Sequence, residues 1–265
     1  KELRRLDKMK ESFIQITAHE LRTPLTLVFG YSRLLEDYPP LRELMQYDDG
    51  ISNLTDGLVE SITRMHEIID EIMIVSRVMT RRIDISIQQF NMGSLVKRVV
   101  DSYAEAFAER NHTLVFDIND WPADVRGDVD LMRVAVDNLL SNAIKYTPDG
   151  GTITLQAESD RFFVKFWVKD TGIGIDPDDQ KSIFDQFHTL EDVKLHSTSK
   201  TAFRGGGLGL GLAVVKGVIE AHGGAIKVDS PRRDVNALPG SRFEVMLPLK
   251  ATPPQGVRDV NRSTE

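Results

Sequence analysis

The chain contains several groups of residues that could carry out chemistry, and the first is a histidine beside an acidic residue. His19 is followed directly by Glu20, and Thr23 lies four positions after the histidine. A neutral imidazole is a nucleophile as well as a base, and Glu20 could hydrogen-bond one ring nitrogen and leave the other more basic. In a helix Thr23 would share a face with His19, where its hydroxyl could position a water. The same residues also fit a core helix that bends at Pro24 and carries a surface histidine.

A second group is a stripe of polar side chains within residues 129–146, a segment whose periodicity predicts a helix. Asn138 and Asn142 lie four positions apart, and Lys145 or Tyr146 continues the same face. Asparagine is a mediocre helix former, so two on one stripe need a reason. An amide oxygen is a neutral, hard ligand suited to Mg²⁺, and Lys145 could meet phosphate charge. A solvated polar face is the alternative interpretation.

Two glycine-rich segments complete the set. The first, Asp170-Thr171-Gly172-Ile173-Gly174, ends an expected strand, and a buried aspartate there could read an exocyclic amine while the glycines admit a flat ligand. The second, residues 204–212, precedes an apolar helix, and backbone N–H groups in such a place form a phosphate site. It matches neither a P-loop nor a dinucleotide fingerprint. A purely structural glycine hinge is the alternative.

Two regions with different predicted secondary structure must position these groups. The first eighty residues carry two apolar stripes at helical spacing, and the first stripe ends at Tyr38-Pro39-Pro40. We expect a helical hairpin with a short connection, which pairs most economically with a second copy as a four-helix bundle. The rest mixes strands and helices, which predicts an α/β sandwich with helices on one face of a sheet. Expected strands and helices of this region are residues 83–87, 92–110, 113–118, 129–146, 152–157, 162–168, 209–221, 225–229 and 242–247.

Composition limits the remaining possibilities. The chain has 265 residues, of which 41% are hydrophobic and 28% charged, as in ordinary globular proteins. It has no cysteine, which excludes disulfides, thiolate metal sites and cysteine nucleophiles. The net charge of −7 argues against nucleic acid as the main partner. We expect no membrane contact by this segment and a cytoplasmic location. Because it opens with Lys1 and lacks a signal peptide, we expect a fragment of a longer protein.

The order of these motifs resembles that of the sensor histidine kinases of two-component systems. The sequence His19-Glu20-Leu21-Arg22-Thr23-Pro24 is similar to their phosphoacceptor motif. The asparagine helix, the Asp170 segment and the glycine-rich segment resemble the ATP-binding domain that these kinases share with type II topoisomerases, a heat-shock chaperone and mismatch-repair ATPases. The resemblance covers residues from about 10 to 248.

The resemblance implies a role for each residue. His19 would be phosphorylated from ATP, with Glu20 assisting as a base and Thr23 acting in dephosphorylation of a response regulator. Asn142 would bind Mg²⁺, and Asp170 would read adenine. The remaining nucleotide-binding residues would be Asn138, Lys145, Tyr146, Gly172, Gly174, Gly207, Gly209, Leu210 and Gly211.

The sequence therefore predicts the catalytic core of a homodimeric histidine kinase that uses ATP and Mg²⁺ and passes its phosphoryl group to the receiver domain of a response regulator. Residues 1–82 would form the dimerisation and phosphotransfer domain, 83–250 the ATP-binding domain, and 251–265 a disordered tail. One rival interpretation is an ATPase or serine-directed kinase with the same ATP fold, which leaves the His19 helix unexplained. Another is a nonenzymatic dimeric signalling module, which leaves the asparagine stripe and the glycines unexplained.

Overall fold

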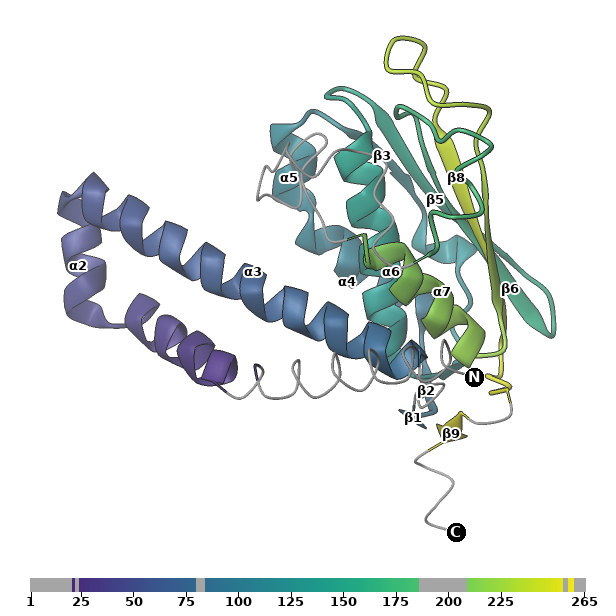
Figure 1. Ribbon diagram of the computed structural model, residues 1–265, viewed down its shortest axis with the longest axis horizontal. Helices are drawn as coiled ribbons and strands as arrows, with labels where there is room; N and C mark the ends of the chain where they lie inside the picture. The colour runs from purple at the N-terminus through teal and green to yellow at the C-terminus, as the bar shows by residue number, and fades with distance from the viewer. Residues whose placement is uncertain (1–20, 22–23, 80–83, 186–208, 255–256, 260–265) are drawn as a thin grey trace, which may run out of the picture. The chain divides into compact units, whose positions relative to one another are not determined.

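The structure is a computed structural model that describes residues 21, 24–79, 84–185, 209–254 and 257–259 (Figure 1). The chain divides into two compact units, Lys1–Thr80 and Arg81–Glu265. Each unit has its own architecture and is described by itself. No helix in the described residues is both long and apolar enough to cross a membrane.

The described part of the first unit is helical. Residues 24–36 form one helix, α2 spans Pro39–Tyr47, and α3 spans Asp49–Met79 and runs back beside the first helix (Figure 1). The prolines end the first helix as expected, but they also begin α2, because proline suits the first helical turn, whose N–H groups have no partner. The expected short connection is therefore wrong, since a nine-residue helix joins the two long ones.

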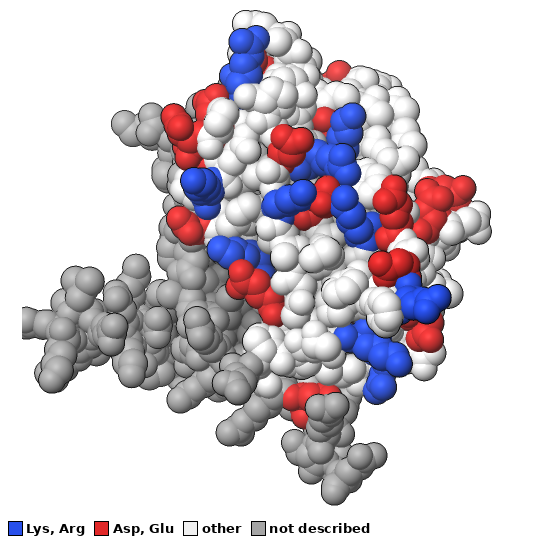
Figure 2. All heavy atoms as spheres, turned by 90° about the vertical axis from the view of Figure 1, so that its right-hand side faces the viewer, with Lys and Arg blue, Asp and Glu red and all other residues white. Residues whose placement is uncertain are grey.

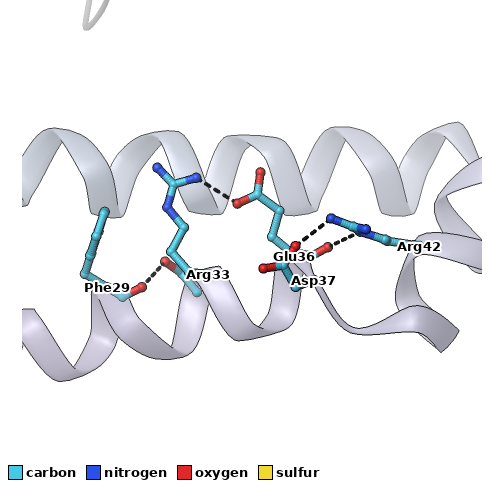
Figure 3. Close-up of polar contacts among 6 residues, drawn as sticks. Phe29, Arg33, Glu36, Asp37 and Arg42 are labelled. Atoms are coloured by element: carbon cyan, nitrogen blue, oxygen red, sulfur yellow. Dashed lines mark hydrogen bonds and ion pairs between the residues drawn. The ribbon is translucent and has the colours of Figure 1, made fainter.

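Polar contacts fix the turn between the first helix and α2 (Figure 3). Arg42 of α2 donates through Nε to the carbonyl oxygen of Glu36 at 2.9 Å and pairs with Asp37. The Glu36 carboxylate accepts from Arg33 at 2.9 Å. Arg42 thus satisfies a carbonyl at the end of the first helix that has no partner within that helix.

The described part of the hairpin leaves many apolar side chains exposed. Among the described side chains of this unit, only Ile62 and Met73 are buried hydrophobics. Large apolar side chains at least 40% exposed are Leu21, Leu27, Val28, Tyr31, Leu34, Leu35, Tyr38, Leu44, Tyr47, Leu54, Leu58 and Met65. An apolar surface of this extent is typical of a helix pair that packs against another protein surface.

The second unit is a sheet covered by helices on one face (Figure 1). Among the described residues, five strands lie in the order β3, β5, β6, β8, β7, with β3 parallel to β5 and the other neighbours antiparallel. Their bounds are Thr113–Phe116, Thr152–Ser159, Phe163–Asp170, Ser241–Pro248 and Ala225–Asp229. The helices are α4 (Met92–Ser102), α5 (Ala104–Glu109), α6 (Val129–Tyr146) and α7 (Gly211–Ala221).

The core of this unit lies between the sheet and the helices, because alternate side chains of each strand point toward them. Core side chains that are at most 1% exposed include Val164, Phe166, Val168 and Val245 on the strands and Leu139, Leu140, Ile144, Val214 and Val218 on the helices. The opposite face carries interspersed acidic and basic side chains (Figure 2). Glu244 lies among Lys165, Lys227 and Arg242 on that face, at 3.1 to 3.3 Å.

Several expected elements differ in their bounds. The expected helix over residues 92–110 is two helices that meet at Tyr103. The expected strand over 83–87 is two strands, β1 (Asp84–Ile85) and β2 (Gln88–Phe90). Strand β4 (Val125–Gly127), which pairs with β2, was not expected, and β3 gives way to a short 3₁₀ helix at Ile118–Asp120. These short pieces are held by contacts distant in sequence, which local propensity does not report.

Beyond Lys250, in the stretch expected to be a disordered tail, the described residues make backbone contacts with the rest of the second unit. The Ala251 N–H donates to the Arg126 carbonyl at 2.8 Å, and Thr252 N–H donates to that of His222 at 3.1 Å. Strand β9 (Arg258–Asp259) pairs in parallel with β1. Backbone hydrogen bonds to the edges of other segments hold this stretch, and a polar composition does not reveal them. We call residues 250–254 and 257–259 the C-terminal clasp.

Candidate functional site

The described part of the predicted site lies in the second unit. His19, Glu20, Thr23 and Gly207 lie outside the described residues, so their roles stay predictions. The other predicted residues belong to three segments of this unit: the polar face of α6, the segment that follows β6, and the start of α7.

Helix α6 has the bounds that its pattern predicted, and it has the expected two faces. Leu139, Leu140, Ala143 and Ile144 are buried, whereas Asn138, Asn142, Lys145 and Tyr146 are half-buried. The Asn138 amide donates to the Val134 carbonyl at 2.9 Å. The Asn142 side chain makes no hydrogen bond to any described residue, which leaves its amide oxygen available to a ligand.

Asp170 is a buried carboxyl at the end of β6. It is 4% exposed, and its Oδ1 accepts hydrogen bonds from the backbone N–H of Gly172 at 2.8 Å and of Ser241 at 3.2 Å. Burial raises the pKa of Asp170 to about 6, against the opposing effect of these two hydrogen bonds. Its Oδ2 accepts no hydrogen bond from the described part of the chain, so this oxygen can receive a donor from a ligand.

The two glycines after Asp170, Gly172 and Gly174, lie close to backbone carbonyl oxygens of the protein. A Cβ on Gly172 would lie 2.3 Å from the Tyr146 carbonyl oxygen, and the neighbouring Ile173 N–H donates to that same oxygen at 3.1 Å. Gly174 has φ +74°, and a Cβ there would lie 2.0 Å from the Arg232 carbonyl oxygen. Gly172 thus permits close packing against the end of α6, and Gly174 permits close packing against the Arg232 backbone. Their predicted role in admitting a flat ligand stays a prediction.

The start of α7 lies beside the polar face of α6. A Cβ on Gly211 would approach the Asn138 Oδ1 to 2.4 Å, and Gly209 has φ +67°. Leu210 is 1% exposed, so its side chain belongs to the core. The glycine at position 211 thus permits the first turn of α7, with its N–H groups, to lie against Asn138.

The other end of α6 is held by a buried histidine that the sequence did not single out. Asp128 caps α6 by accepting from the N–H groups of Asp130 and Leu131. The Asp128 N–H donates to Nε2 of His222 at 2.9 Å, and Nδ1 of His222 lies 2.7 Å from the Val218 carbonyl oxygen. Because a carbonyl only accepts, the proton sits on Nδ1. Burial lowers the pKa of His222, which keeps the ring neutral.

Together these segments can hold a nucleotide. They offer a buried carboxyl for an amine, an available amide on α6, a lysine at its end, and a helix N-terminus for phosphates. No cluster of three or more acidic, histidine or cysteine residues able to hold a metal occurs among the described residues. Asn142 could supply an amide oxygen to a magnesium ion, with phosphate oxygens and waters as the other ligands, a set that suits this ion.

Comparisons with known proteins agree with both units. Residues 9–81 match the model of the His Kinase A (phospho-acceptor) domain, and residues 127–251 match that of the histidine kinase-, DNA gyrase B- and HSP90-like ATPase. The phosphate regulon sensor protein PhoR of Pseudomonas aeruginosa is 29% identical over 232 residues, which are 85% of this chain and 48% of PhoR. The chain spans less than half the length of the curated relatives it matches.

Two solved structures share the fold. Full-length ShkA in complex with AMPPNP has a TM-score of 0.68 at 24% identity, covering 92% of this chain and 47% of ShkA. Histidine kinase ThkA, solved in complex with the response regulator protein TrrA, has a TM-score of 0.56 at 24% identity, covering 96% of this chain and 65% of that one.

Proposed function

The chain belongs to the two-component sensor histidine kinases, and on that premise we propose that it phosphorylates its own His19 from ATP and passes the phosphoryl group to a response-regulator aspartate. The observation that supports this most is the meeting of α6, Asp170 and the start of α7 in one unit. The phosphoacceptor match around His19 lies in the other unit. An ATPase with the same fold would need only the first of these features.

In the proposed site Asp170 accepts from the exocyclic amine of adenine, and Lys145 faces the phosphates. Asn138 and Tyr146 line the nucleotide, and the glycines of the glycine-rich segment, Gly207, Gly209 and Gly211, lie beside the phosphates. Magnesium, held in part by Asn142, neutralises charge on the phosphates. The phosphoacceptor domain occupies residues 1–82 and the ATP-binding domain 83–250.

The transfer step is a displacement at phosphorus. A ring nitrogen of His19 forms the new bond to the γ-phosphorus while the bond to the ADP oxygen breaks, and Glu20 accepts the proton from the other ring nitrogen. Positioning and charge neutralisation supply most of the acceleration in such reactions. The phosphoryl group then moves to a carboxylate oxygen of the response regulator, and the proton held by Glu20 returns to the other ring nitrogen, which regenerates neutral His19.

We further propose that the active form is a homodimer, which acts in the cytoplasm where ATP is supplied. The exposed apolar side chains of the hairpin support a second copy as their cover, since two hairpins make a closed four-helix bundle. Incubation with γ-labelled ATP tests the whole proposal. Acid-labile label on the chain supports it, whereas free phosphate alone would indicate an ATPase, and neither product would indicate a nonenzymatic module.

Thr23→Ala should separate two activities: autophosphorylation persists and dephosphorylation of the response regulator falls. The Thr23 hydroxyl is proposed to place a water beside the aspartyl phosphate and has no part in the forward transfer. Alanine favours a helix, so stability should hold. The measurement is the rate at which a labelled response regulator loses its phosphoryl label in the presence of ADP and either the wild-type or the Thr23→Ala kinase. The regulator is one that the phosphorylated kinase labels. Equal rates of label loss with an active wild type would contradict this role.

Asn142→Asp should lower the autophosphorylation rate about tenfold or more, a change that corresponds to about 1.4 kcal/mol, while the thermal midpoint changes little. The amide makes no hydrogen bond to the described residues, so its loss breaks no such contact, but the new carboxylate repels phosphate. Ser141→Ala, on the same helix and half-buried, is the matched control. Parallel losses of rate and midpoint in Asn142→Asp would favour a structural role.

A further inference from the structure

Arg110 is a buried cation that the sequence reasoning missed. It lies at the end of α5, and its side chain is 10% exposed. Nε donates to Asp149 Oδ1 at 2.8 Å, one terminal nitrogen donates to the Ile144 carbonyl oxygen at 2.6 Å, and the other to that of Thr147 at 2.7 Å. A buried charge persists only where it is paired in this way.

Two of these three acceptors lie at the C-terminal end of α6: Ile144 is in its last turn and Thr147 is its C-cap residue. Carbonyls in the last turn of a helix have no partner within it, and the partial negative charge there favours a cation. His112 adds to the same end, with Nε2 at 3.2 Å from the Thr147 carbonyl oxygen and 3.1 Å from that of Pro148. Burial lowers the pKa of His112, and the nearby Arg110 charge lowers it further. The C-terminal end of α6 is thus bound by two hydrogen-bond donors, the charged Arg110 and the neutral His112.

The two carbonyls that Arg110 binds lie on either side of two residues of the proposed nucleotide site. Lys145 and Tyr146 lie between Ile144 and Thr147, whose carbonyls Arg110 holds. One of the two carbonyls between them, that of Tyr146, accepts instead from Ile173 in the segment that begins at Asp170. The C-terminal end of α6 is therefore held by Arg110 at Ile144 and at the C-cap residue Thr147, and by the Asp170 segment at Tyr146.

We propose that Arg110 is a positioning residue for ATP: it fixes the last turn of α6 so that Lys145 and Tyr146 face the nucleotide. This inference rests on the proposed function, because it assigns that turn to nucleotide binding. An arginine suits the task because its planar fork directs separate N–H groups at two carbonyls at once. A lysine keeps the charge but presents a single nitrogen on a flexible stem.

The alternative is a helix cap with no bearing on the ligand. A cap alone predicts that Arg110→Lys lowers the thermal midpoint while the folded protein binds ATP as before. Positioning predicts weaker ATP binding at a temperature well below both midpoints. The two interpretations therefore differ in the affinity of the folded protein and agree on its stability.

The experiment titrates Mg·ATP into the full 265-residue chain and its variants by calorimetry and measures the KM for ATP and kcat of autophosphorylation. Arg110→Lys should raise both the Kd and the KM for ATP about tenfold, the usual cost of a lost charged hydrogen bond, with a smaller change in kcat. The matched control is Asp149→Asn, whose side chain is 70% exposed and which leaves both carbonyl contacts in place. Its Kd should stay within about twofold of wild type.

A folded Arg110→Lys chain with wild-type Kd and KM overturns the proposal and leaves a cap. An equal loss in Asp149→Asn also overturns it, because the ion pair and not the carbonyl grip would then matter. Arg110→Gln, which keeps a donor without the charge, should show a loss at least as large as Arg110→Lys. A wild-type chain that binds no Mg·ATP would instead refute the proposed function, so the two failures are distinguishable.

Discussion

His19→Gln should abolish phosphoryl label on the chain and leave ATP affinity at the wild-type value. The glutamine amide nitrogen has no available lone pair, so it cannot attack phosphorus as an imidazole nitrogen does. Position 19 lies in the first unit, whereas every described residue of the proposed nucleotide site lies in the second. Chemistry and binding should therefore separate completely.

His66→Gln is the matched control for this prediction. His66 lies on α3 of the same unit, where Nδ1 is 3.3 Å from Asp70, and it has no role in the proposed transfer. It should keep the label. Gel detection of acid-labile label after incubation with γ-labelled ATP decides between the two histidines, and label retained in His19→Gln would refute the assignment.

Asp170→Asn should have two opposite effects: it removes ATP binding and stabilises the unliganded fold at neutral pH. The loss arises because an amide that presents its NH₂ group to the adenine amine cannot accept from it. The gain arises because Asp170 is buried with a pKa of about 6 against an ordinary value of 3.8. A raised folded-state pKa means that ionisation opposes folding, so the wild type loses stability as the pH rises through about 6.

The size and the pH dependence of this gain follow from the same numbers. A difference of roughly two pKa units corresponds to about 3 kcal/mol above pH 7, with little difference between variant and wild type near pH 4. Denaturant unfolding at several pH values measures it in the absence of nucleotide. Asp160→Asn is the control of opposite sign, because hydrogen bonds from Phe162 and Phe163 lower the pKa of that exposed carboxyl. A gain independent of pH would contradict the explanation.

The sequence predicted best those features that depend on neighbouring residues. Helix α6 begins and ends where its periodicity indicated, and β7 has its expected bounds, because both signals are local. Strand β4 and the C-terminal clasp depend on partners elsewhere in the chain. Backbone pairing between such short segments leaves no periodic pattern in the residues themselves.

The same distinction holds within the site. Asn142 and Asp170 belong to compact motifs, so sequence alone could name them. Arg110 reaches carbonyls 34 and 37 residues away, and His222 accepts from an N–H 94 residues away, so only the folded chain brings them to the two ends of α6. The partners of Arg110 named above are all at least 34 residues away in the sequence, so the residues around it do not indicate this role.

The C-terminal clasp brings the first and last described strands of the second unit together. Asp84 pairs with Arg258 and Ile85 with Asp259, so these two strands lie one strand spacing apart, about 4.8 Å. Adjacent ends are the condition under which a domain tolerates circular permutation. A short linker could therefore join residue 259 to residue 84, and new ends could open at the exposed turn between β5 and β6. Such a permuted chain would connect the elements of this unit in a different order and keep the spatial arrangement that forms the proposed nucleotide site.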